Sequence, residues 1–155
     1  MTAYPMFLVL AMLTMLAAVQ AACHFPVEVA KQYAGLANPM QACHEALIQY
    51  ADHTPGVSGT IAPAAVDGFL PPGASDPGLF TYVITAPGTV TTYLSVPQRG
   101  QRIAVAALQK LTLYSVVAGP VIGGQIVPRL PVQPVTAPPG VPDGVIAIQS
   151  IVRNH

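Results

Sequence analysis

The sequence predicts an α+β fold in which an N-terminal transmembrane helix continues into a helical neck, followed by a small domain with a mainly antiparallel β-sheet and one or two packed helices. Three observations predict it. The chain has no charged side chain before Glu28, residues 27–52 have helical periodicity, and the remainder alternates short β-patterned runs with proline and glycine turns. The expected boundaries are 1–25 for a membrane anchor or signal segment, 26–54 for the neck and 55–155 for the small domain.

The composition narrows the classes of partner. The 155 residues are 52% hydrophobic and 8% charged, and six basic residues balance six acidic ones. This neutrality argues against nucleic acid, which requires a basic footprint, and against a strong patch for anionic lipids. A neutral surface with few charges tends to associate, which indicates a place within an assembly. The alternative is limited solubility, offset by a membrane anchor.

The apolar N-terminal segment is the strongest single signal. Residues 6–19 are interrupted only by Thr14, and extension to Cys23 reaches about the minimum length that spans a bilayer. We expect an uncleaved anchor with the short N-terminal tail in the cytoplasm and the rest of the chain translocated.

Two alternatives to the anchor remain open. A cleaved signal peptide would place its cleavage site after Ala21, but the segment lacks the basic start that such peptides have. A lipoprotein would be acylated at Cys23, yet Gln20 stands where an apolar residue is expected.

The neck is predicted to be helical over 27–52, with a break at Asn38 and Pro39. The residue before proline is pushed away from helical angles, Asn38 is a suitable N-cap, and proline suits the first helical position. After the break one face is apolar, which is typical of an amphipathic helix. This stripe packs on the following domain or is shared with a partner helix, and its four side chains are our candidate interaction residues: Met40, Cys43, Leu47 and Tyr50.

No metal or cofactor site is predicted. Cys23 and Cys43 are the only cysteines, and we expect no bond between them, because twenty helical residues would separate them by about 30 Å. The neighbouring residues in Cys43-His44-Glu45 and Asp52-His53 invite a metal site, but the spacing of these polar residues does not match that of known metal-binding motifs. We interpret them as solvated side chains near a helix end.

The small domain opens with a β-hairpin. Residues 79–85 and 90–96 alternate in polarity and are rich in β-branched and aromatic side chains, and residues 86–89 between them form a turn sequence. Phe80, Tyr82 and Ile84 are expected on one face of the sheet.

The period then changes to that of a helix over 101–114. Short strands are expected at 116–118 and 125–127, and a strong strand at 145–152. The helical stripe comprises Ala104, Ala107, Leu108, Leu111 and Tyr114, with Gln101, Arg102, Gln109 and Lys110 outside it.

A search for catalytic patterns finds none. The serines have no nucleophile-elbow context, no histidine lies in the expected sheet, and the acids are scattered or in turns. The Gly123-Gly124 pair lacks the Lys and Ser/Thr of a phosphate-binding loop. We therefore predict a protein that is not an enzyme, with no catalytic residues and no small-molecule substrate.

The order of elements resembles the PilM family of accessory proteins of type IV pili of the conjugative thin-pilus type. The pieces that carry the likeness are turn and strand signals spread over nearly the whole chain: the helix with Tyr50, then Gly59-Thr60-Ile61, Phe69-Leu70-Pro71, the hairpin, the Val/Gly-rich run Ser115 to Gly119, and Pro142-Asp143-Gly144-Val145-Ile146. The chain has no Trp where an early aromatic anchor of the sheet is expected, and Phe80 or Tyr82 takes that place.

The resemblance implies an inner-membrane protein with a single span, whose periplasmic domain belongs to the pilus assembly machinery. Its partners would be other pilus assembly proteins. An exported or lipid-anchored periplasmic binding module is the alternative. A pilin-like subunit is a second alternative, although the basic leader with a glycine before the cleavage point is missing, since no glycine precedes Gly35.

Overall fold

The computed structural model describes residues 35–85, 88–96, 105–109, 117–128 and 132–152. Over these ranges no helix is both long and apolar enough to cross a membrane. The predicted anchor over 1–25 lies outside the described residues, as does Cys23.

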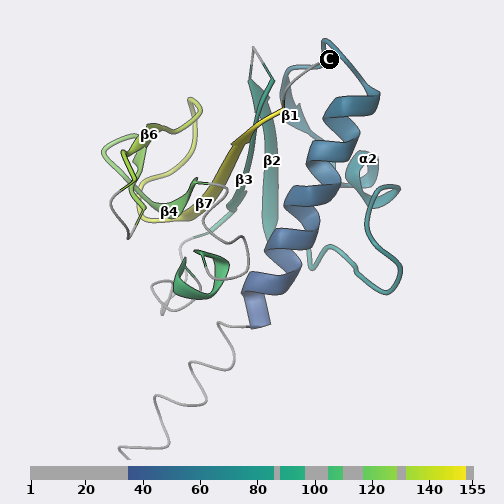
Figure 1. Cartoon of the computed structure of the whole chain (residues 1–155), viewed down its shortest axis with the longest axis horizontal. Helices are drawn as coiled ribbons and strands as arrows, with labels where there is room; N and C mark the ends of the chain where they lie inside the picture. The colour runs from purple at the N-terminus through teal and green to yellow at the C-terminus, as the bar shows by residue number, and fades with distance from the viewer. Residues whose placement is uncertain (1–34, 86–87, 97–104, 110–116, 129–131, 153–155) are drawn as a thin grey trace, which may run out of the picture. The chain divides into compact units, whose positions relative to one another are not determined.

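The described part of the chain forms one antiparallel sheet beside helical segments, which confirms the α+β class (Figure 1). The sheet has seven strands in the order β1-β2-β3-β7-β4-β5-β6. Their bounds are β1 Gly59–Ile61, β2 Phe80–Thr85, β3 Thr89–Leu94, β4 Val117–Ile122, β5 Gln125–Ile126, β6 Val135–Thr136 and β7 Ile146–Ile151.

The predicted hairpin is confirmed as β2 and β3. Phe80 pairs with Leu94 at its open end, and Thr85 pairs with Thr89 beside the turn. Gly88 has a positive φ of 81°, and its carbonyl accepts a hydrogen bond from the Val152 amide at 2.8 Å. The turn that closes the hairpin therefore also forms a hydrogen bond with the residue that follows β7.

The strand expected at 145–152 is confirmed as β7, and it lies in the middle of the sheet, between β3 and β4. β4 continues through Gly119 and Pro120, beyond the strand expected at 116–118. The reason is a close crossing of the chain: the Val127 amide donates to the Pro120 carbonyl at 2.9 Å, and a Cβ atom on Gly119 would stand 2.1 Å from the Val127 carbonyl oxygen. Glycine is required for this approach.

The neck helix covers residues 35–53 without interruption, so the break expected at Asn38 and Pro39 is wrong. Ala37, before the proline, is fully buried, as are Cys43 and Leu47 after it. Apolar burial on both sides of Pro39 favours one continuous helix over the local preference of the Asn-Pro pair. The helix ends before Pro55 and Gly56, as expected.

Two short elements went unpredicted. The helix α2 (Pro63–Asp67) follows β1 and begins with proline at its first turn, and β6 pairs Val135 with Ile126. Residues 105–109 are helical, within the predicted 101–114. Gln109, expected outside the apolar stripe, is 6% exposed because its Nε2 donates to the Ala118 carbonyl at 3.2 Å.

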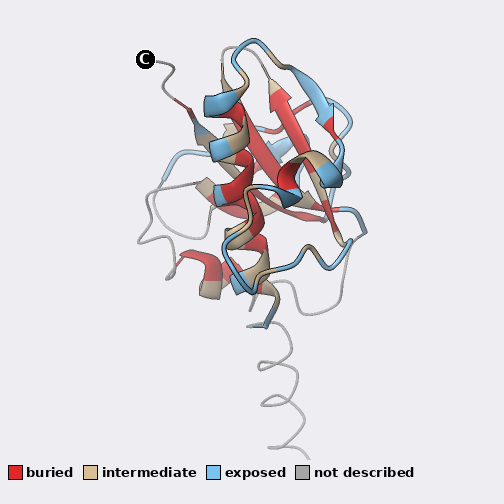
Figure 2. Ribbon diagram, turned by 90° about the vertical axis from the view of Figure 1, so that its right-hand side faces the viewer, coloured by how far each residue is buried: buried red, intermediate tan, exposed pale blue. Residues whose placement is uncertain are grey.

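The core lies between the long helix and the central strands. Figure 2 shows the buried positions on these strands and along one side of the helix, whose other side is exposed. Tyr82, Met40, Leu47, Leu94 and Ile148 are among its largest fully buried side chains. The helix is therefore fixed to the sheet, and its outer side is the surface left for other contacts.

Candidate functional site

The stripe of four candidate residues divides between core and surface. Met40, Cys43 and Leu47 have relative exposures of 2%, 0% and 0%, so this chain's own domain covers them, as in the core-packing alternative. Tyr50 is only partly buried and makes an edge contact with Phe69, with 5.9 Å between ring centroids. A contact of the stripe with a partner helix stays a prediction, and among these four residues only Tyr50 has accessible surface for it.

His44 lies between the helix and the sheet. Its Nδ1 is 3.1 Å from the Thr92 hydroxyl on β3, and its Nε2 is 2.7 Å from the Ser150 hydroxyl on β7. The side chain is 3% exposed, so our interpretation of it as solvated is wrong. Position 44 directly follows the buried Cys43 and turns toward the sheet, where two hydroxyls satisfy both ring nitrogens. Spacing along the helix could not reveal this, because both partners come from distant strands.

Burial without a carboxylate partner keeps this imidazole neutral. Removal from water lowers the pKa of His44 from 6.5 to about 3. A neutral ring has one donor and one acceptor nitrogen, and serine and threonine hydroxyls can match either tautomer. A serine nucleophile needs a base that can take up a proton and an acid that orients that base. The second nitrogen of His44 contacts the Thr92 hydroxyl and not a carboxylate. We therefore interpret His44, Thr92 and Ser150 as a contact that holds the helix against β3 and β7.

A second buried polar group joins β2 to the loop that precedes it. The Tyr82 hydroxyl donates to Asp76 Oδ2 at 2.7 Å, and Asp76 Oδ1 accepts the Gly78 amide at 2.8 Å. Cys43 is a free, buried thiol. Burial raises the pKa of the Cys43 thiol and of the Tyr82 hydroxyl. Both groups stay protonated at neutral pH, and neither is prepared to act as a nucleophile.

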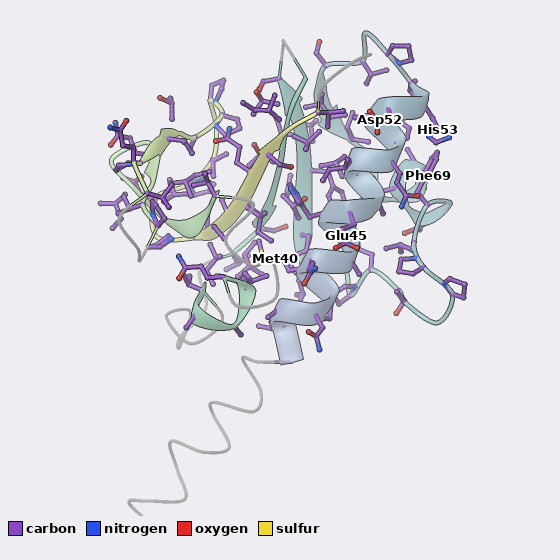
Figure 3. The ribbon with its side chains drawn as sticks, in the orientation of Figure 1. Met40, Glu45, Asp52, His53 and Phe69 are labelled. Atoms are coloured by element: carbon purple, nitrogen blue, oxygen red, sulfur yellow. The ribbon has the colours of Figure 1, made fainter. Side chains whose placement is uncertain are left out.

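On its other side the helix borders a groove of about 360 Å³. Phe69, in the segment that follows α2, contacts both Tyr50 and His53, with 5.4 Å between the Phe69 and His53 rings. Figure 3 labels Glu45, Asp52 and His53 on the helix and Phe69 beside it. The groove is lined by Glu45, Ala46, Gln49, Gly68, Phe69, Leu70, Pro71 and Pro72.

One wall of this groove is apolar and the other is polar. Phe69, Leu70 and the two prolines form the first, and the Glu45 carboxylate and Gln49 amide belong to the second. Both helix residues are exposed, and Glu45 accepts a hydrogen bond from Gln41 Nε2 at 2.8 Å. An open groove of this kind suits a segment of another protein better than an enclosed small molecule. Within the described residues, no three His, Cys, Asp or Glu side chains lie close enough to hold a metal ion.

Comparison with known proteins gives the family. The model of the family described as PilM matches residues 7–148. The chain belongs to the PilM family. The match begins within the apolar N-terminal segment and ends within β7, so the family pattern includes the long helix, the groove and most of the sheet. Membership of the PilM family points to pilus biogenesis and to partners in pilus assembly.

Two solved structures are similar to this PilM-family chain. A PilM protein from Escherichia coli B7A shares 18% identity, with 81% of this chain and 93% of that chain covered and a TM-score of 0.49. A PilM protein from Pseudomonas aeruginosa 2192 shares 28% identity over 76% of this chain and 94% of that chain, with a TM-score of 0.43. No curated protein matches the chain.

Proposed function

We propose that this chain is a non-enzymatic component of the assembly machinery of a type IV pilus of the conjugative thin-pilus type, anchored in the inner membrane by one span. The neck and the small domain would lie in the periplasm. The observation that carries the proposal is the family match over residues 7–148. It supports a role in pilus biogenesis.

The anchor is supported by the sequence alone. Residues 6–23 contain no charged side chain and are apolar except for Thr14 and Gln20, and they reach about the minimum length for a bilayer. An uncleaved anchor would hold the domain at the membrane surface, beside the machinery that assembles pilin subunits.

A non-enzymatic role is supported by the way the polar side chains are used. The buried His44 is held by two hydroxyls, and Tyr82 is held by Asp76. His44 connects the long helix to the sheet, and Asp76 connects the loop before β2 to that strand. The exposed groove offers apolar contact and one carboxylate, which suits recognition of a protein.

The test is an in-frame deletion of the gene, with pili imaged and conjugation in liquid measured. We expect loss of pili, full rescue by the wild-type gene, and poor rescue when residues 1–25 are replaced by a cleavable signal peptide. Normal piliation in the deletion strain would refute the assembly role and favour the exported binding module. Full rescue by the variant with the cleavable signal peptide would support the assembly role but show that the anchor is not needed for it.

The topology has a separate test. N-terminal sequencing of the purified protein should find the uncleaved start, whereas a mature chain that begins at Ala22 or Cys23 would rule out the anchor. An epitope tag at the C-terminus should be digested by protease in spheroplasts with an intact inner membrane. Protection of the tag there would place the domain in the cytoplasm, against the proposal.

A further inference from the structure

The polar wall of the groove beside the long helix carries two carboxylates in a row. Glu45 lines the groove and is exposed, and its one printed partner, the Gln41 amide, is uncharged and leaves its negative charge in place. Asp52 is also exposed and lies two helical turns further along nearly the same face, about 10 Å away. Figure 3 labels both residues on the helix, with Phe69 beside it. The helix therefore presents two negative charges at a defined spacing.

The opposite wall contributes apolar surface and few backbone donors. Phe69 and Leu70 are half-buried and pack against the core, which fixes their position. Pro71 and Pro72 follow them and are exposed. Proline has no backbone N–H, so this pair offers its rings and not hydrogen-bond donors. A ligand can bury apolar atoms against this wall, but its orientation must come from the carboxylates on the helix.

The charge of the surface near the groove is negative over the described residues. Asp67, the exposed last residue of α2, immediately precedes Gly68, which lines the groove. Residues 35–85 and 88–96, which form the groove and the strands beside it, contain four acids and neither Lys nor Arg. One of these acids, Asp76, is engaged by Tyr82. The remaining three attract a positively charged ligand.

The size and spacing of the groove select an extended ligand. Its volume of about 360 Å³ lies at the lower end of the range for ligand pockets. An α-helix, about 10–12 Å across with its side chains, is too wide for it. In a polyproline-II segment, side chains three residues apart share one face and lie about 9 Å apart, close to the separation of Glu45 and Asp52. Side chains on one face of a β-strand are about 7 Å or 13 Å apart, and neither distance matches.

We propose that the groove binds a polyproline-II segment of another protein that carries two Arg or Lys residues three positions apart, with apolar residues between them. The two cations face Glu45 and Asp52, and their apolar stems and the residues between them lie against the wall of Phe69, Leu70 and the two prolines. Such a segment is stiff before it binds and loses little entropy. The chemistry of this ligand goes beyond the proposed role in pilus assembly and does not rest on it.

The first test is fluorescence anisotropy of a labelled peptide, Pro-Pro-Arg-Pro-Leu-Arg-Pro-Pro, with the full chain in uncharged detergent at low salt. A control peptide of the same composition, Pro-Pro-Arg-Leu-Arg-Pro-Pro-Pro, turns its arginines to different faces. It should bind about threefold more weakly, the size of one exposed ion pair. A peptide with Glu in place of both arginines should bind at least about tenfold more weakly. Equal binding of the two arginine peptides would overturn the proposal, as would no binding of the first at about 1 mM.

The second test locates the peptide on the protein. Glu45→Gln and Asp52→Asn should each weaken binding of the first peptide about threefold, and together about tenfold, because each removes one exposed ion pair. The matched control is Asp143→Asn, which removes one exposed negative charge outside the groove lining and should change binding less than about 1.5-fold. Circular dichroism confirms that each variant is folded. Unchanged binding by the folded double variant would refute the groove. An equal effect of Asp143→Asn and of Glu45→Gln would assign binding to net charge and refute it as well.

Discussion

Acidification should weaken this domain through one side chain, His44. In the folded chain burial lowers the pKa of His44 to about 3, whereas the unfolded chain has the ordinary value of 6.5. Below pH 6.5 the imidazole of His44 binds a proton in the unfolded state but not in the folded state. The free energy of unfolding therefore falls as the pH falls. The loss begins near pH 6.5 and is complete below about pH 3.

The loss of unfolding free energy at pH 4.5 depends little on the pKa that His44 has in the folded state. Two pH units below the unfolded pKa, the unfolded state gains about 2.7 kcal/mol from protonation, at 1.36 kcal/mol per unit. The folded imidazole is still almost entirely neutral there. Since small domains are stable by about 5–15 kcal/mol, a loss of this size from one residue is readily measured.

The assay is urea unfolding followed by circular dichroism at pH 7.5 and at pH 4.5, for the wild type and for His44→Gln. Glutamine does not titrate and can still bond one of the two hydroxyls, Thr92 or Ser150. The variant should be less stable at pH 7.5 by about 1–3 kcal/mol, since one buried group loses its partner. Between the two pH values it should lose about 2.7 kcal/mol less than the wild type. Parallel losses in the two proteins would show that His44 is protonated in the folded state and refute the reasoning.

Three further substitutions and one control, Gln49→Ala, test the packing, each by urea unfolding. Leu47→Ala should cost about 2–5 kcal/mol because Leu47 is fully buried, whereas the exposed neighbour Gln49→Ala should change stability by less than about 0.5 kcal/mol; equal effects would contradict the packing of the helix on the sheet. Gly119→Ala should cost about 2–3 kcal/mol, since a Cβ atom there meets the Val127 carbonyl oxygen at 2.1 Å, and a neutral result would contradict that approach. Tyr82→Phe should cost about 1–2 kcal/mol through the lost bond to Asp76, and an unchanged midpoint would mean that water replaces this bond without cost.

Local patterns predicted the elements whose signals lie within a few residues. The hairpin was visible because alternating residues flank a turn sequence, and β7 because a β-branched run follows Pro142-Asp143-Gly144. The stripe through Met40, Cys43 and Leu47 was visible from helical spacing, and core packing, one of its two interpretations, is what the structure shows.

The remainder depended on partners far apart in the sequence. The helix continues through Pro39 because Ala37, on the N-terminal side of the proline, is also buried. The apolar periodicity after the proline does not predict the burial of Ala37. His44 was placed in solvent because Thr92 and Ser150, which bond it, lie 48 and 106 positions away. The groove arises because residues 68–72 lie beside the helix. No sequence motif predicts this approach.

The central place of β7 has a consequence for how the chain is made. Tyr93 on β3 must pair with Ala147, which the ribosome adds about fifty residues later, and pairings this distant in sequence form slowly. Until then β3 has an unpaired edge, and β4 has no neighbour on its inner side. The sheet therefore closes only after β7 has been made. A chain that cannot close early stays extended for longer, which is the condition in which a polypeptide can be threaded through a membrane channel.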